Sequence, residues 1–228
     1  MKSRLLLLSL LAFLVTPLAA QKPDAPKKRE PSPALAPIQD VPALPRVLLI
    51  GDSISIGYTL PVRKFLEGKA NVHRIPTNGG PTKKGMESID KWLGDGKWDV
   101  IHFNWGIHDL KIMEDGKRQV EPADYEKNLR ALVAKMKATG AKLIWATTTP
   151  IPDGDLNPAR KFGQVKEYNE IAAKVMAENG VPTDDLNTLI TPELARLQNP
   201  RDVHYKGEGY EFLAKQVAAE IEKALPKK

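Results

Sequence analysis

The sequence contains no cysteine, which excludes disulfide bonds and membrane attachment through a lipid-modified cysteine. It also lacks a long hydrophobic run, since the apolar stretch at residues 5–15 falls short of the about 20 residues that span a membrane. The net charge of +6 is modest, and no stripe of Lys and Arg interleaved with aromatic residues occurs, which argues against nucleic-acid binding. The length of 228 residues suits one domain with some additional sequence.

The first residues have the pattern of a secretory signal peptide. Lys2 and Arg4 precede the apolar stretch, and the small residues Ala19 and Ala20 follow it. We therefore predict a signal peptide over residues 1–20 and a secreted or periplasmic protein without stable membrane insertion after cleavage. An uncleaved N-terminal anchor is the alternative.

The next segment differs in composition from the rest of the chain. Residues 21–45 carry a proline every few positions and no periodic apolar pattern, which predicts an extended linker. The folded domain is then expected to span residues 46–228.

In that domain, short apolar runs alternate with amphipathic helical patterns. Several runs are apolar at successive positions, as is typical of strands buried on both faces of a parallel sheet. The intervening segments repeat apolar residues at helical spacing and end at glycines. This alternation predicts one α/β domain, a three-layer α/β/α sandwich around a five-stranded parallel sheet. The expected strands are Val47–Ile50, Asn71–Ile75, Asp99–Phe103, Lys142–Thr148 and a shorter one near Val181.

The segments that follow the expected strands are rich in glycine and polar residues. Ligands of open parallel sheets bind beyond the carboxyl ends of the strands, so we expect these segments to meet at a functional site. They read "GDSIS" from residue 51, "TNGGPT" from residue 77, "NWGIHDL" from residue 104 and "TTTPIPDG" from residue 147; "DVHYKGEGY", from residue 202, precedes the last expected helix.

Ser53 is the candidate nucleophile of this site. A serine hydroxyl needs a base within hydrogen-bond reach, and His204 is the candidate base. Asp202, two residues before it, is the candidate carboxylate that orients the ring and stabilises the imidazolium. The alternative is that Asp52 or Ser53 only caps the following helix and that His204 is a polar loop residue. The G-x-S-x-G elbow, the P-loop and the dinucleotide fingerprint are absent.

Three further residues are candidate donors to a developing oxyanion. Gly80 would let a backbone N–H approach the oxygen, and Asn104 and His108 have side-chain N–H groups. The alternatives are turn formation for Gly80 and polarity at a strand end for Asn104.

Together these segments resemble the sequence blocks of the SGNH hydrolases, the GDSL-like esterase and lipase superfamily. The resemblance covers nearly all of residues 46–228, with the blocks in the expected order. It implies a flavodoxin-like fold, with Ser53 as nucleophile and Gly80 in the glycine block. "WGIHDL" is similar to the third block, and "DVHYKGEGY" to the last, which carries the catalytic acid and histidine.

Two positions depart from the family pattern. His108 stands where the family has its oxyanion asparagine; a neutral imidazole can still donate one N–H, and a protonated ring would be a stronger donor at low pH. Arg201 stands where the family places its acid, three residues before the histidine, which leaves Asp202 as the nearest substitute. A backbone carbonyl, Asp184 or Asp185 could orient the histidine instead.

From these observations we predict a secreted serine esterase that needs no cofactor. The expected substrates are ester-bearing small molecules or polysaccharides, in particular O-acetyl groups on carbohydrate. The alternatives are a lysophospholipase or thioesterase for longer acyl chains, and a catalytically inactive binding protein. Trp105 is a candidate substrate contact. Asp153 and Asp155 lie in a Pro/Gly-rich loop, where turn formation is the simpler interpretation than cation binding, so no metal is expected.

Overall fold

The computed structural model describes residues 32–227. The predicted signal peptide and residues 21–31 of the predicted linker lie outside the described residues.

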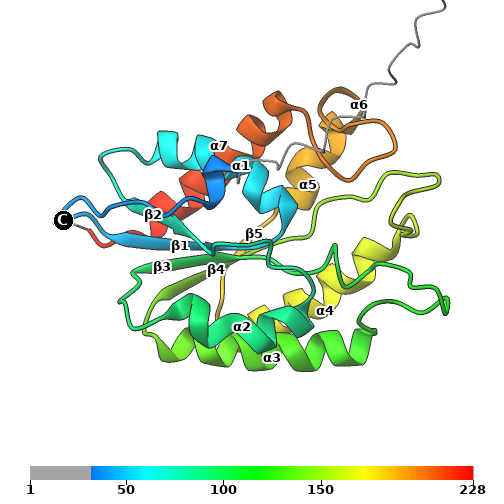
Figure 1. Ribbon diagram of the computed structural model, residues 1–228, viewed down its shortest axis with the longest axis horizontal. Helices are drawn as coiled ribbons and strands as arrows, with labels where there is room; N and C mark the ends of the chain where they lie inside the picture. The colour runs from blue at the N-terminus through cyan, green and yellow to red at the C-terminus, as the bar shows by residue number, and fades with distance from the viewer. Residues whose placement is uncertain (1–31, 228) are drawn as a thin grey trace, which may run out of the picture. The chain divides into compact units, whose positions relative to one another are not determined.

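Five parallel strands form one sheet in the order β2-β1-β3-β4-β5, which confirms the predicted fold class (Figure 1). Strand β1, second in this order, pairs with β2 on one side and β3 on the other, so that Leu48 lies opposite both His73 and Ile101. At the edge, β5 is only two residues long. The strands are β1 Arg46–Ile50, β2 Asn71–Arg74, β3 Val100–Phe103, β4 Lys142–Ala146 and β5 Thr183–Asp184.

Helices cover both faces of the sheet (Figure 1). The side chains of β1 explain why, since Leu48 and Ile50 enter one hydrophobic core while Val47 and Leu49 enter the other. The first core lies under α2 Thr82–Leu93, α3 Pro122–Ala138 and α4 Gln164–Asn179. The second lies under α1 Ser53–Phe65, α5 Leu186–Ile190, α6 Leu194–Leu197 and α7 Gly207–Ala224. Two short 3-10 helices, η1 Pro33–Leu35 and η2 Thr191–Glu193, complete the described elements.

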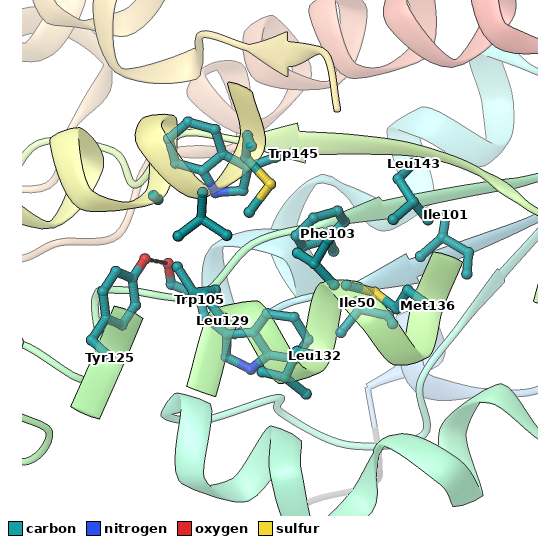
Figure 2. Close-up of a cluster of buried hydrophobic side chains, with 14 of the residues drawn as sticks. Ile50, Ile101, Phe103, Trp105, Tyr125, Leu129, Leu132, Met136, Leu143 and Trp145 are labelled. Atoms are coloured by element: carbon teal, nitrogen blue, oxygen red, sulfur yellow. Dashed lines mark hydrogen bonds between the residues drawn. The ribbon is translucent and has the colours of Figure 1, made fainter. Parts of the chain in front are cut away.

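Figure 2 shows part of the first core, in which Trp105 packs among side chains from β1, β3, β4 and α3. Trp105 is 1% exposed, and a Cβ added to Gly85 of α2 would stand 2.9 Å from its ring. The Tyr125 hydroxyl donates a 2.8 Å hydrogen bond to the Trp105 backbone carbonyl. The sequence-based suggestion that Trp105 contacts substrate is therefore wrong, because its ring is enclosed by the core.

Residues 32–45 pack against the domain instead of extending away from it. Asn71 of β2 holds this segment through its side chain, which accepts from the Val41 N–H at 2.8 Å and donates to the Val41 and Leu44 carbonyls. Ala34 of η1 is buried. The predicted start of the folded part, near Arg46, is therefore too late, because backbone hydrogen bonds to a side chain leave no periodic pattern in the sequence.

No helix within residues 32–227 has the length and hydropathy that a membrane crossing requires.

Candidate active site

The turn between β1 and α1 presents Ser53 at the first position of a helix. Asp52 caps the helix, because its Oδ1 accepts the Ile54 N–H at 2.8 Å. The helix-capping interpretation is thus correct for Asp52, and the Ser53 hydroxyl takes no part in the cap. Gly79 must be glycine here, since a Cβ on it would stand 2.8 Å from the Gly51 carbonyl oxygen. The result is a hydroxyl beside a helix N-terminus, where the backbone dipoles favour negative charge.

A buried arginine on β2 holds this turn in place. Arg74 Nη2 donates to the Gly51 and Asp52 carbonyls at 2.8 and 2.9 Å, and Nη1 donates to the Ile75 and Thr77 carbonyls at 3.0 and 2.8 Å. Burial lowers the pKa of Arg74 to about 10, so it keeps its charge at neutral pH. Sequence reasoning did not single out Arg74, because an arginine in an apolar strand gives no sign of the carbonyls it will meet.

Ser53, His204 and Asp202 come together as the sequence predicted they would. His204 Nε2 lies 2.8 Å from Ser53 Oγ, and His204 Nδ1 lies 2.7 Å from Asp202 Oδ1. Burial raises the pKa of Asp202, but hydrogen bonds from the His204 ring and backbone outweigh it and hold this pKa below its usual value. A hydroxyl, a base and a carboxylate are thus joined by two successive hydrogen bonds, the geometry that activates a serine.

The short spacing between Asp202 and His204 works because the chain turns tightly before them. Arg201 has a φ of 53°, in the left-handed region, and the Asn199 N–H donates to the His204 carbonyl at 2.9 Å. This turn brings the Asp202 carboxylate into contact with the ring of His204, two residues later in the chain.

The two other carboxylates considered for this role lie elsewhere. Asp184 pairs with the buried His102, whose Nε2 is 3.0 Å from Asp184 Oδ2. Asp185 caps α5 through Thr188 and accepts from the Thr147 hydroxyl. Neither contacts His204, so Asp202 alone of the three is placed to orient it.

Of the three predicted oxyanion residues, His108 lies at the site. Its side chain lines the same cavity as Ser53 and His204. Burial, followed by the nearby charges of Lys111 and Arg160, lowers the pKa of His108 to about 3. The ring is therefore neutral, with one N–H available to donate, and the expected strengthening by protonation at mildly acidic pH does not apply.

Asn104 and Gly80 are engaged elsewhere. The Asn104 amide donates to the Ala146 carbonyl at 2.8 Å and to Thr148 Oγ1 at 3.2 Å, so both of its N–H groups hold the end of β4. Asn104 therefore acts as a structural link, which corrects its assignment as an oxyanion donor. Gly80, with a φ of 62°, donates its N–H to Asn78 Oδ1 at 2.9 Å and would have to exchange this acceptor to bind an oxyanion.

The residue after His108 ties its loop to α2. Asp109 is fully buried, and its Oδ1 accepts from the Thr82 N–H and hydroxyl at 2.8 and 2.6 Å. Its Oδ2 has no partner within residues 32–227. Burial raises the pKa of Asp109 to about 7, so the carboxyl exchanges its proton near neutral pH.

The cavity beside Ser53 has a volume of about 130 Å³ and a basic lining that sequence reasoning missed. Lys111, Arg160 and Arg201 all contribute to it. Arg160 is almost fully buried, with Nε donating to the Ile107 carbonyl at 2.7 Å. Lys111 could have been suspected from its place three residues after His108. The position of Arg160 in the loop after β4 gave no such signal.

The described part of the chain brings no three His, Cys, Asp or Glu side chains together as a metal site. In the loop after β4, Asp153 Oδ1 accepts the Gly154 N–H at 2.8 Å, as in a turn.

Comparison with solved structures shows the same fold in several esterases. A lipase/acylhydrolase from Enterococcus faecalis has a TM-score of 0.69 and 24% identity, covering 81% of this chain and 99% of its own. An acetylxylan esterase from Geobacillus stearothermophilus has a TM-score of 0.65 and 21% identity, covering 78% and 94%. Another acetyl xylan esterase has a TM-score of 0.67 and 17% identity, covering 77% and 99%.

The comparison with curated protein sequences finds no match. The model of the GDSL-like lipase/acylhydrolase family matches residues 49–212, a span that begins in β1 and ends in α7. It thus includes Ser53, His108, Asp202 and His204. The chain belongs to the GDSL-like lipase/acylhydrolase family, which confirms its predicted membership of the SGNH hydrolases.

Proposed function

We propose that this protein hydrolyses carboxylic esters with Ser53 as its nucleophile. The observation that carries the proposal is the line of contacts from Ser53 Oγ to His204 Nε2 at 2.8 Å and from His204 Nδ1 to Asp202 at 2.7 Å. In this arrangement, His204 takes the hydroxyl proton as Ser53 attacks the ester carbonyl, and then returns it to the departing alcohol. Water, activated by the same ring, hydrolyses the acyl-enzyme.

The oxyanion of the tetrahedral intermediate would be held at the start of α1. The Ser53 backbone N–H belongs to the first turn of that helix, and the His108 ring supplies a second donor from the loop after β3. The Gly80 N–H becomes a third if it leaves Asn78. No step requires a cofactor.

Short acyl groups fit the site best. An engineered cavity of about 150 Å³ accommodates a benzene ring, so the cavity of about 130 Å³ beside Ser53 takes a group of comparable size. This size favours an acetyl ester over the long acyl chain of a lysophospholipid. Two of the structural neighbours are acetyl xylan esterases, which supports O-acetylated carbohydrate as the substrate class.

Export is also part of the proposal. It rests on the sequence of residues 1–20, in which positively charged residues are followed by a short apolar stretch and then by small residues.

Labelling with a fluorophosphonate probe, read by intact mass, tests the mechanism. We expect one adduct on the wild type and none on Ser53→Ala or His204→Ala. Ser55→Ala is the matched control, because Ser55 lies two residues further along α1 with its hydroxyl buried, and it should label normally. A folded wild type that takes no label would overturn the proposal and favour a binding protein on the same fold.

Acyl preference is measured separately on para-nitrophenyl esters. A much higher kcat/KM for the acetate than for the octanoate supports the acetylesterase, whereas the reverse order favours the long-chain alternative.

A further inference from the structure

We propose that the natural ester of this site carries a negative charge close to the scissile bond, as an O-acylated acidic sugar does. The proposal rests on the esterase function above and specifies its substrate class. It starts from the three cationic side chains, Lys111, Arg160 and Arg201, that line the cavity together with Ser53.

These three cations come from separate parts of the fold. Lys111 lies three residues after His108 in the segment that follows β3, Arg160 lies in the loop between β4 and α4, and Arg201 directly precedes Asp202. Their common position at the cavity is therefore not a consequence of being close together in the sequence. The fold brings all three to the cavity that Ser53 lines.

Within residues 32–227, none of the three forms an ion pair. Among the other arginines, Arg63 and Arg74 likewise bond only backbone carbonyls, whereas those at positions 46, 118, 130 and 196 each pair with an Asp or Glu within 4 Å. Arg160 keeps its Nε and Nη1 on the Ile107 and Pro158 carbonyls, which fixes the guanidinium without neutralising it. Holding a cation in a buried position without an anion is unfavourable, so an anionic ligand would relieve the cost.

The acids that face the cavity do not balance this charge. Asp202 lines it, but its Oδ1 is occupied by the His204 ring and backbone. Asp52 lies behind Ser53, fully buried, with its Oδ1 on the Ile54 N–H. Burial lowers the pKa values of both Arg160 and Lys111, and the opposing effect of the nearby carboxylates, Asp52 on both and Asp202 on Arg160, does not cancel it. His108 is neutral and adds no charge of its own.

The chemistry of the lining suits a carboxylate. Arginine presents a planar pair of N–H donors that matches a carboxylate, and lysine adds a point charge. The anionic group could belong to the alcohol, as in a uronic acid, or to the acyl group, as in a half-ester of a dicarboxylic acid. The two arms of the test separate these sources.

The test compares kcat/KM for isosteric pairs of charged and neutral esters. Para-acetoxybenzoate against para-acetoxybenzamide places the charge on the alcohol side. Para-nitrophenyl hemisuccinate against its neutral amide, para-nitrophenyl succinamate, places it on the acyl side. We expect the wild type to prefer the anionic member of at least one pair, and to lose this preference near 1 M salt, where the Debye length is about 3 Å.

Two variants locate the effect. Lys111→Gln and Arg201→Asn should each lower the charged-to-neutral ratio about fivefold; asparagine is chosen at position 201 because it tolerates the left-handed backbone there. Lys142→Gln is the matched control, because Lys142 is an exposed lysine at the start of β4, at the opposite end of that strand from the site. It should leave the ratio unchanged.

The outcomes distinguish the two proposals. Equal kcat/KM for both members of both pairs, or a ratio that Lys111→Gln and Arg201→Asn leave unchanged, overturns the anionic substrate while ester hydrolysis stands. If the wild type hydrolyses none of the esters, the proposed function fails. The charge preference is then read from calorimetric binding of para-acetoxybenzoate and para-acetoxybenzamide to Ser53→Ala, where equal affinities overturn it and tighter binding of the carboxylate supports it.

Discussion

Asp202 Oδ1 accepts hydrogen bonds from both the backbone N–H and the ring Nδ1 of His204, at 3.2 and 2.7 Å. A carboxylate two residues before the histidine thus binds the peptide and the imidazole of the same residue. The contact places the ring proton on Nδ1 and leaves the Nε2 lone pair facing the Ser53 hydroxyl. The carboxylate that contacts the His204 ring is therefore supplied by a local turn.

Asp202→Asn should lower kcat by about 10²–10⁴-fold with little change in KM. The amide can donate to Nδ1, which stabilises the tautomer with its proton on Nε2, and that tautomer cannot accept the serine proton. Steady-state kinetics on para-nitrophenyl acetate, with circular dichroism as a check of folding, measures this. A variant that retains more than about half of kcat would contradict Asp202 as the orienting residue.

His108 should be replaceable by asparagine but not by alanine. His108→Ala removes an oxyanion donor, and we expect kcat to fall about 10²–10³-fold. His108→Asn restores an amide N–H and should keep kcat within about tenfold of the wild type. Equal activities of the alanine variant and the wild type would exclude His108 from the oxyanion site.

Asp109→Asn should change how stability depends on pH. The folded-state pKa of about 7 lies above the usual 3.8, so between these values the folded state binds this proton more strongly than the unfolded chain. The free energy of unfolding contributed by Asp109 therefore falls as pH rises from about 4 to about 7, by on the order of a few kcal/mol.

Urea unfolding at the two ends of this range measures the effect. We expect Asp109→Asn to gain stability relative to the wild type as pH rises. Asp95→Asn is the control, because Asp95 is an exposed carboxylate just after α2 that forms no ion pair within residues 32–227, so its loss should change stability equally at both pH values. If the free energies of unfolding of the wild type and Asp109→Asn differ by the same amount at both pH values, the raised pKa of Asp109 is refuted.

Trp105→Phe tests the core assignment of this ring. The smaller side chain leaves a space between α2 and the sheet, and we expect a loss of about 1–3 kcal/mol in the free energy of unfolding. KM for short esters should stay the same, because the ring is enclosed by the core. A raised KM with unchanged stability would return Trp105 to the substrate site.

The sequence by itself determined the α/β sandwich and the local parts of the candidate site. The contact between Ser53 and His204, which are 151 positions apart, depends on the tertiary structure. β1 is buried on both faces, so its successive apolar residues, Val47–Ile50, could be recognised without knowing their neighbours. The turn that holds Ser53 and the Asp202–His204 contact depend on residues close in the chain. Features of this kind follow from local backbone geometry, which short sequence patterns record.

Tertiary structure alone decided the contacts between distant segments. Asn104 could be assigned only once its amide was seen to bond the end of β4, and Trp105 only once α2 and α3 enclosed its ring. Arg160 reaches the cavity because the loop after β4 folds back onto the Ile107 carbonyl. The packing of Ala34 has the same origin. Such contacts join segments tens of residues apart, where no local propensity applies, so only the folded chain reveals them.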